Sequence, residues 1–340
     1  MATCGRRRSN FAMSIVLQRF LLVGLVVCAV GAGGGAQAAP ARLTVVATIF
    51  PVADLVRQVA GPDAEVLLLL PPGASPHTFE PTPDTMRALA RSRIFFMVGA
   101  GLENWAGKLV SSAAPRDLTL VDLSQGVPLI IELESPESRA GRHLYGATLG
   151  LDSGSRPGRE HREESHAGEA NPHYWTDPLI ALELVDRIEA TLAAAVPGSR
   201  AAFAARAASL RARLRDLDEE IRRSVAGFRN RRLVTFHNSW PYFARRYGLD
   251  LAGVIEVAPG REPGPQHLSR IVAAIRVLKV PAIFAEPQLP ARPAEVLARE
   301  TGVKVLVLDP IGGVAPDRLG YVELMRFNLR SLEQGLKDRD

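Results

Sequence analysis

Short runs of Val, Ile, Leu and Phe recur along the chain and alternate with segments whose apolar residues have helical spacing. The apolar runs cover residues 43–50, 65–70, 94–98 and 118–122 in the first half, and 233–236, 251–257, 282–285 and 304–308 in the second. Continuous apolar strands that alternate with helices are typical of parallel sheets covered on both faces. The pattern predicts an α/β fold of two Rossmann-like lobes, each built on a mainly parallel sheet.

One long helix is predicted between the two sets of strands. Residues 200–228 carry apolar side chains at spacings of three and four, so one face of the helix is apolar. Strand–helix alternation resumes directly after it, which favours a rigid backbone helix joining the lobes over an ordinary core helix. This interpretation places a first lobe at 39–198, the linking helix at 199–228 and a second lobe at 229–340.

The first 38 residues differ from the rest. They contain four arginines and no acidic residue, then an apolar run at 20–30, and they end in Ala36-Gln37-Ala38. A basic head, a short apolar middle and an A-x-A end indicate a secretory signal peptide over 1–38. A membrane anchor is the alternative, but the apolar run is short for a bilayer. We therefore expect an exported protein.

Charge and cysteine content exclude several classes of function. The net charge of +5 falls to +1 without the arginine-rich leader, so the basic balance does not indicate a nucleic-acid partner. Both cysteines, Cys4 and Cys28, also lie in the leader. Residues 39–340 therefore have no disulfides and no thiolate ligands, and a metal site there must use His, Asp or Glu.

The segment 135–170 interrupts the strand–helix pattern inside the first lobe. It is rich in Gly, Ser, Arg, Glu and His and has few large apolar residues, so it is predicted to be a long, mobile surface loop. Its histidine and glutamate residues include His143, Glu160, His161, Glu163, Glu164, His166 and Glu169.

Four polar residues stand where the predicted elements meet. His77 lies in a loop after the second strand, His237 and Asp309 directly follow strands of the second lobe, and His173 precedes a helix. Ligands of open α/β sheets bind beyond the carboxyl ends of the strands. Three imidazoles and one carboxylate suit Zn²⁺, with Mn²⁺ possible. Capping or core roles remain the alternative for each residue alone.

Six stretches carry a family resemblance, in order, across roughly the whole mature chain. They are VVATIFP (45–51), PHTFEPTP (76–83), NPHYWTDP (171–178), FHNSWPYF (236–243), FAEPQ (284–288) and LDP (308–310). Together they resemble the periplasmic zinc- and manganese-binding receptors of metal ABC transporters, and most of all the zinc receptors. The fold of that family is two α/β lobes linked by a rigid helix.

The resemblance implies that His77, His173, His237 and Asp309 occupy the ligand positions. Manganese receptors usually carry Glu at the third position, so His237 favours zinc. The implied protein is a monomeric, non-enzymatic periplasmic receptor that delivers Zn²⁺ to a membrane permease. Glu80 or water is the alternative to Asp309 in completing the site.

The segment 135–170, Glu286 and the overall function each allow more than one interpretation. Segment 135–170 corresponds to a loop that is often His-rich in zinc receptors, so it is either an auxiliary metal-binding loop or a plain insertion. Glu286, which ends another strand, is expected either to orient a histidine N–H or to form a salt bridge. The alternative functions are a manganese receptor, an extracellular adhesin, and a zinc hydrolase with Glu80 or Glu286 as general base.

Overall fold

The structure is a computed structural model, and it describes residues 42–132, 169–256 and 260–337. The predicted signal peptide and nearly all of segment 135–170 lie outside these described residues. The described residues from Leu43 onward pack as one compact unit. Within the described residues, no helix is both long and apolar enough to cross a membrane.

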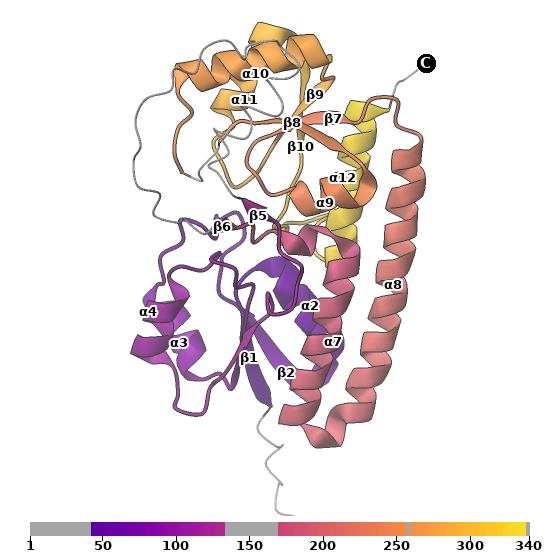
Figure 1. Cartoon of the computed structure of the whole chain (residues 1–340). Coiled ribbons are helices and arrows are strands. Elements are labelled where there is room, and N and C mark those ends of the chain that lie inside the picture. The colour runs from indigo at the N-terminus through magenta and orange to yellow at the C-terminus, as the bar shows by residue number, and fades with distance from the viewer. Residues whose placement is uncertain (1–41, 133–168, 257–259, 338–340) are drawn as a thin grey trace, which may run out of the picture. The chain divides into compact units, whose positions relative to one another are not determined.

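The first half forms a parallel four-stranded sheet with the order β2-β1-β3-β4. Its strands are β1 (Leu43–Ala47), β2 (Ala64–Leu68), β3 (Ile94–Met97) and β4 (Thr119–Asp122). Val45 in the centre pairs with Val66 on one side and Ile94 on the other. The helices α3 (Pro83–Ala90) and α4 (Ala106–Ala113) lie on one face, and α2 (Phe50–Ala60) lies on the other (Figure 1).

The second half forms another parallel four-stranded sheet, with the order β10-β9-β7-β8. Its strands are β7 (Arg232–Thr235), β8 (Asp250–Val254), β9 (Ala282–Ala285) and β10 (Lys304–Val307). Its helices are α9 (Pro241–Tyr247), α10 (Pro265–Leu278), α11 (Arg292–Thr301) and α12 (Tyr321–Leu336). Read from its other edge, the second sheet has the order β8-β7-β9-β10. In both sheets, therefore, the second strand in the chain lies at one edge, next to the first, and the third and fourth follow. The two halves share this topology, which the sequence did not reveal as a repeat. The α/β fold with two parallel sheets is confirmed.

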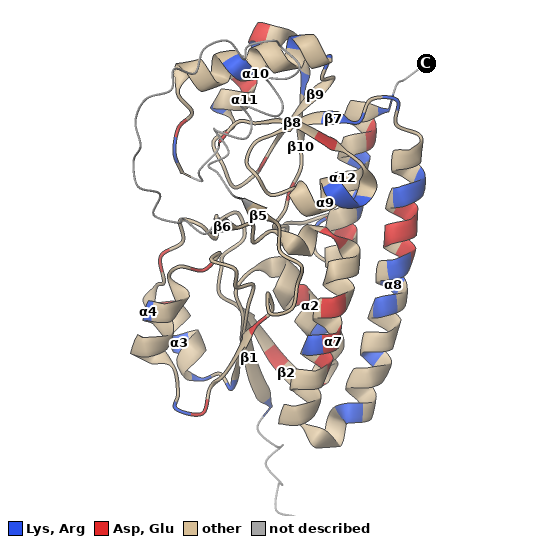
Figure 2. Cartoon of the chain, in the orientation of Figure 1, with Lys and Arg blue, Asp and Glu red and all other residues tan. Residues whose placement is uncertain are grey.

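Two long helices form an antiparallel pair beside the sheets, α7 (Pro178–Ala195) and α8 (Arg200–Ala226) (Figure 1). The buried stripe of α8 faces α2 and α7 in the first half and α9 and α12 in the second. Its outer face carries both signs of charge (Figure 2), and Arg211 lies 2.7 Å from Asp186 and 2.8 Å from Glu189 on α7. The helix ends two residues before the predicted boundary, because Gly227 caps it.

One hydrophobic cluster runs through both halves. It joins Val45 of the first sheet, Leu217 of α8 and Phe284 of the second sheet, all fully buried. A separate cluster lies between the second sheet and helices α10 and α11. The shared core means that the two sheets are held in a fixed relation by packing as well as by the chain connection.

Two short strands that the sequence did not indicate lead into the candidate site. β5 (Ile131–Glu132) pairs antiparallel with β6 (Glu169–Ala170), so the two ends of the segment between them are joined. Directly after β6, the Asn171 N–H donates to the Ile130 carbonyl at 2.8 Å. The ribbon therefore fixes where the chain enters the 171–178 stretch.

Candidate metal centre

His77 is presented by the loop that follows β2. The indole Nε1 of Trp105, at the start of α4, donates to the carbonyl of Pro76 at 3.2 Å. The ring of Phe79 packs edge-on against the same indole, with ring centroids 5.0 Å apart. These contacts anchor the loop on both sides of His77, whose own side chain is half-buried.

His173 is held by the residue two positions before it. The Asn171 side-chain oxygen accepts from the His173 main-chain N–H at 3.0 Å and lies 3.0 Å from His173 Nδ1. Because that oxygen is an acceptor, Nδ1 carries the proton and Nε2 keeps its lone pair. Asn171 Nδ2 in turn donates to the Asn238 carbonyl at 2.8 Å, which ties this segment to the loop of the next histidine.

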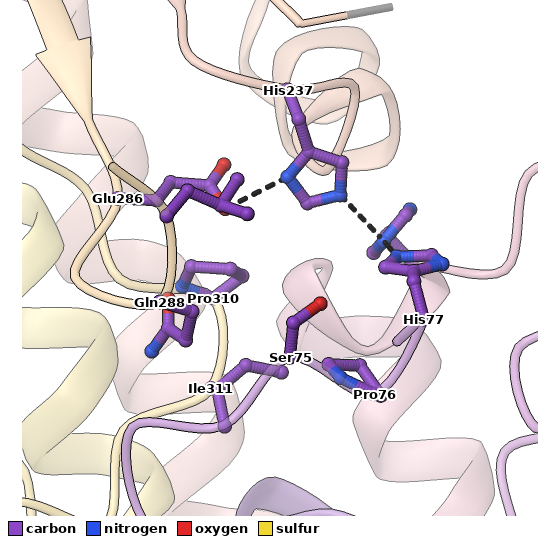
Figure 3. A pocket seen from close by; sticks show the side chains of 10 residues that line it. Ser75, Pro76, His77, His237, Glu286, Gln288, Pro310 and Ile311 are labelled. Carbon is purple, nitrogen blue, oxygen red and sulfur yellow. Dashed lines mark hydrogen bonds and ion pairs between the residues drawn. The ribbon is translucent and has the colours of Figure 1, made fainter. Parts of the chain in front are cut away.

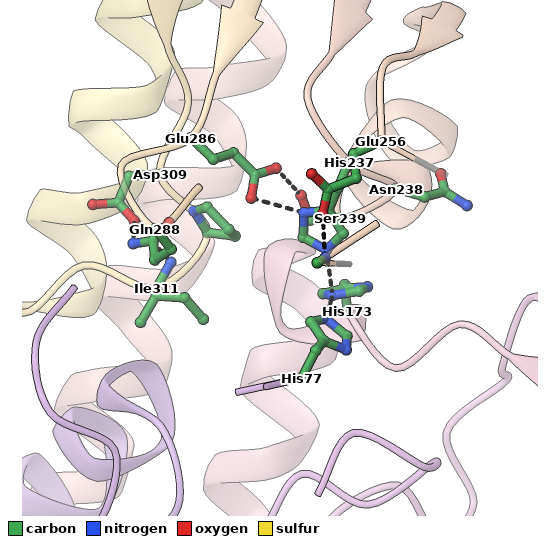
Figure 4. A network of polar contacts seen from close by, with 12 residues as sticks. His77, His173, His237, Asn238, Ser239, Glu256, Glu286, Gln288, Asp309 and Ile311 are labelled. Atoms are coloured by element: carbon green, nitrogen blue, oxygen red, sulfur yellow. Dashed lines mark hydrogen bonds and ion pairs between the residues drawn. The ribbon is translucent and has the colours of Figure 1, made fainter. Parts of the chain in front are cut away.

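His237 lies two residues after β7, and Glu286 lies directly after the neighbouring strand β9. The Glu286 Oε2 atom is 2.7 Å from His237 Nδ1, and Oε1 accepts from the Ser239 hydroxyl at 2.6 Å (Figure 4). A carboxylate accepts, so His237 Nδ1 donates and Nε2 is left as the free ligand atom. Of the two roles expected for Glu286, the contacts agree with orienting a histidine N–H.

The three histidines converge on one point. The Nε2 atom of His173 lies 3.0 Å from that of His77 and 3.1 Å from that of His237, and Figure 4 shows the three side chains together. Nitrogens bound to tetrahedral zinc at the usual bond length lie about 3.3 Å apart, so the spacing fits one shared ion. The Nδ1–H groups of His173 and His237 donate to Asn171 and Glu286. The Nε2 lone pairs of the two rings therefore face each other, and a cation between them would stabilise this arrangement.

Burial favours the unprotonated form of two of the three imidazoles, those of His77 and His173. Desolvation, helped by the nearby His237, lowers the pKa of His77 from 6.5 to about 3. Complete burial lowers the pKa of His173 well below its usual value, with the other two histidines adding to the effect. Neutral imidazole is the form that binds metal, so these two side chains are ready ligands at neutral pH.

Asp309 lies apart from the three histidines. Within the described residues, the group whose candidate ligand atoms lie within 4.8 Å of one another comprises His77, His173 and His237, and excludes Asp309. Asp309 is fully buried, and its oxygens accept from Gln288, from the backbone N–H groups of Ile311 and Gly312, and from Arg318. Its role as a fourth ligand stays a prediction.

The other candidate side chains also lie outside this group. Glu80 is exposed three residues after His77. His267, on α10, is buried, and its Nε2 lies 2.8 Å from the Val254 carbonyl, which agrees with a structural role. His143, His161 and His166 lie outside the described residues, so the auxiliary role of their segment remains a prediction.

Two residues that shape the site were not identified from the sequence. Asn171 was quoted only as part of a motif, although an Asn two positions before a histidine is well placed to bond to its backbone and ring. Arg318 gave no signal, because it lies nine residues after Asp309 in a segment without strand or helix pattern. The histidines, Glu286 and Gln288 line one small pocket (Figure 3).

Comparisons with known proteins agree with this geometry. Residues 45–335 match the family described as "Zinc-uptake complex component A periplasmic". The zinc-binding lipoprotein AdcA of Streptococcus pneumoniae strain R6 is 26% identical over 326 residues, which cover 95% of this chain and 60% of that protein. The high-affinity zinc uptake system protein ZnuA of Bacillus subtilis is 26% identical over 307 residues, which cover 89% of this chain and 90% of that protein.

A solved structure gives the same picture. A crystal structure of ZnuA has a TM-score of 0.72 at 25% identity, and the match covers 87% of this chain and 99% of that one. The streptococcal zinc-binding proteins are longer than this chain, which spans between 56% and 60% of their length.

Proposed function

Since the chain belongs to the family of periplasmic zinc-uptake components, we propose that it is a receptor that captures Zn²⁺ and delivers it to the membrane permease of an ABC transporter. In this proposal the ion is cargo, the protein is not an enzyme, and the chain acts as a monomer in the periplasm. Export depends on the signal peptide predicted over residues 1–38.

The observation that carries the proposal is the convergence of three imidazole nitrogens. His77, His173 and His237 come from three separate segments, and the Nε2 atoms lie 3.0 Å and 3.1 Å apart in two of the pairs. Asn171 and Glu286 hold two of the rings by their Nδ1 atoms. Such outer partners fix the ring orientation and raise the basicity of the metal-binding nitrogen.

The chemistry of these donors favours zinc over manganese. Imidazole nitrogen suits Zn²⁺, whereas Mn²⁺ prefers carboxylate, carbonyl and water oxygens. Three imidazoles leave one position of a tetrahedral ion for Asp309, Glu80 or water, the alternatives that the family resemblance left open. A hydrolase also leaves one position for water, but it needs a free general base near that water. Here both oxygens of Glu286 accept from His237 and Ser239.

The decisive experiment is a metal titration of residues 39–340 after chelator treatment, by calorimetry with Zn²⁺ and Mn²⁺ in competition. We expect one tight zinc site that manganese does not displace. His173→Ala should remove that site, whereas His267→Ala, which also deletes a buried imidazole but outside the cluster, should leave it in place. The absence of tight binding for either ion would refute the receptor function and leave the adhesin hypothesis as the next to test.

A further inference from the structure

The carboxylate of Asp309 is enclosed by four donors. Oδ1 accepts from Gln288 Nε2 at 2.8 Å, from the Ile311 N–H at 3.0 Å and from the Gly312 N–H at 2.9 Å. Oδ2 lies 2.8 Å from the guanidinium of Arg318. A carboxylate has about four lone-pair positions, so Oδ1 is fully used and the charge of Oδ2 is balanced by Arg318.

Arg318 is itself fixed in place. Its guanidinium carbon lies 4.7 Å from the centroid of the Phe327 ring, and its side chain is 17% exposed. Its backbone is bonded on both sides, since the Gly313 N–H donates to its carbonyl at 2.8 Å and its own N–H donates to Val314 at 3.2 Å. A stacked, mostly buried guanidinium beside a carboxylate is a preorganised ion pair.

This ion pair stands next to the metal pocket. Pro310 and Ile311, which directly follow Asp309, line the pocket together with its partner Gln288. In the view of Figure 4, Asp309 and Gln288 lie on one side of Glu286 and the three histidines on the other. The carboxylate is therefore close to the pocket wall, but its bonds hold it back from the histidine nitrogens.

We propose that Arg318 determines metal selectivity by holding the Asp309 carboxylate out of the coordination sphere. This inference rests on the metal site proposed above. With the pair intact, the protein offers an ion three imidazole nitrogens, a set that suits zinc. Without the guanidinium, the buried Oδ2 lacks its counter-charge, and a divalent ion in the adjacent pocket becomes the strongest available partner. An added carboxylate oxygen favours manganese, so Arg318 acts as a positioning residue against that ion.

The test is the ratio of Zn²⁺ to Mn²⁺ affinity in variants of the 39–340 protein. Arg318→Met keeps the apolar stem and removes the charge, and Arg318→Lys keeps the charge. We expect Arg318→Met to raise manganese affinity at least about tenfold, which corresponds to about 1.4 kcal/mol, because a carboxylate oxygen joins the donors. Zinc affinity should change little. Arg318→Lys should retain the parent ratio, and adding Asp309→Asn to Arg318→Met should restore it.

A spectroscopic readout separates selectivity from mere structural damage. Co²⁺ bound to the Arg318→Met protein should show visible absorption bands different from those of the parent, because a carboxylate joins the ion. If the Arg318→Met protein is folded and its affinity ratio and cobalt bands equal those of the parent, the inference is wrong.

Asp309→Asn alone provides a second route if Arg318→Met does not fold. The inference expects zinc affinity to be nearly unchanged in that variant, and a loss as large as that of His173→Ala would overturn it. A parent protein that binds neither ion tightly would overturn both the proposed function and this inference. A parent that binds zinc tightly, with a ratio independent of Arg318, would overturn the inference alone.

Discussion

His237 and Asp309 occupy equivalent places on one sheet but have opposite surroundings. His237 comes two residues after β7, and Asp309 comes two residues after β10. Both are buried, with 6% and 0% of their surfaces exposed. The neighbour of His237 is the acidic Glu286, which accepts a hydrogen bond from Nδ1–H and leaves Nε2 free. The neighbours of Asp309 are donors, including Arg318, which occupy its oxygens.

The difference shows that position at a strand end brings a side chain to the crevice, while its hydrogen-bond partners decide whether it is available there. Strand order contributes as well. In the order β10-β9-β7-β8, one strand separates the strand of Asp309 from that of His237. Two strand spacings amount to roughly 10 Å at the backbone, so the two side chains start far apart.

The largest effect on zinc binding is expected from removing His237, whose Nε2 is free to bind the ion. His237→Ala deletes one of three converging nitrogens, so we expect zinc affinity to fall by about 3 kcal/mol or more, which is over about 100-fold. Competition with a chelator of known affinity measures the change. An affinity equal to that of the parent would remove His237 from the site.

The pattern along the chain predicted the strands of the two main sheets, since each apolar run contains a strand within a few residues of the predicted bounds. It did not indicate β5 and β6, and two of the runs expected to be buried, those of β4 and β10, contain no buried residue within the strand. It also brought His77, His173 and His237 to one place, because strand ends and helix entries meet at one edge of a parallel sheet. Strand order was not predictable, because no local signal states which strands are neighbours. The ion pair of Asp309 with Arg318 was hidden for a similar reason, since Arg318 lies in an irregular loop.

Removing the orienting partner of His237 should have the next largest effect. In Glu286→Gln the side chain keeps its size but loses its charge, so it accepts a weaker hydrogen bond from His237 Nδ1 and no longer increases the basicity of Nε2 to the same extent. We expect zinc affinity to fall about 10–100-fold, as for other partners of metal-binding histidines. Glu295→Gln on α11 is the matched control, because it removes an exposed carboxylate. Equal affinities in the two variants would contradict the orienting role.

Protons provide a third probe, because they compete with a metal ion for the histidine nitrogens. The pKa of His77 is lowered to about 3 in the folded protein, whereas it is about 6.5 in an unfolded chain. Between these values only the unfolded chain takes up this proton, so the free energy of unfolding of the metal-free protein decreases as pH falls below about 6.5.

Urea unfolding at pH 7 and pH 5 measures that loss. Allowing for partial exposure of His77, we expect the parent to lose about 1–2 kcal/mol more than His77→Asn on this acidification. Using the difference between the two proteins cancels carboxyl groups that titrate in both, such as Asp54 and Glu103, whose pKa values burial raises. Equal losses in the two proteins would show that His77 protonates as freely when folded as when unfolded.

The smallest effect on zinc binding is expected from replacing Asp309, whose oxygens already accept hydrogen bonds from other residues. Asp309→Asn keeps the shape of the side chain and removes a charge that Arg318 neutralises, so zinc affinity should change by less than about threefold, well below the tenfold that 1.4 kcal/mol produces. Asp317→Asn, which removes a more exposed carboxylate nearby, is the matched control, and the same chelator competition measures both. A loss in Asp309→Asn comparable to that in His237→Ala would show that position along the strand outweighs the hydrogen-bond partners, and the contrast between the two residues would then be wrong.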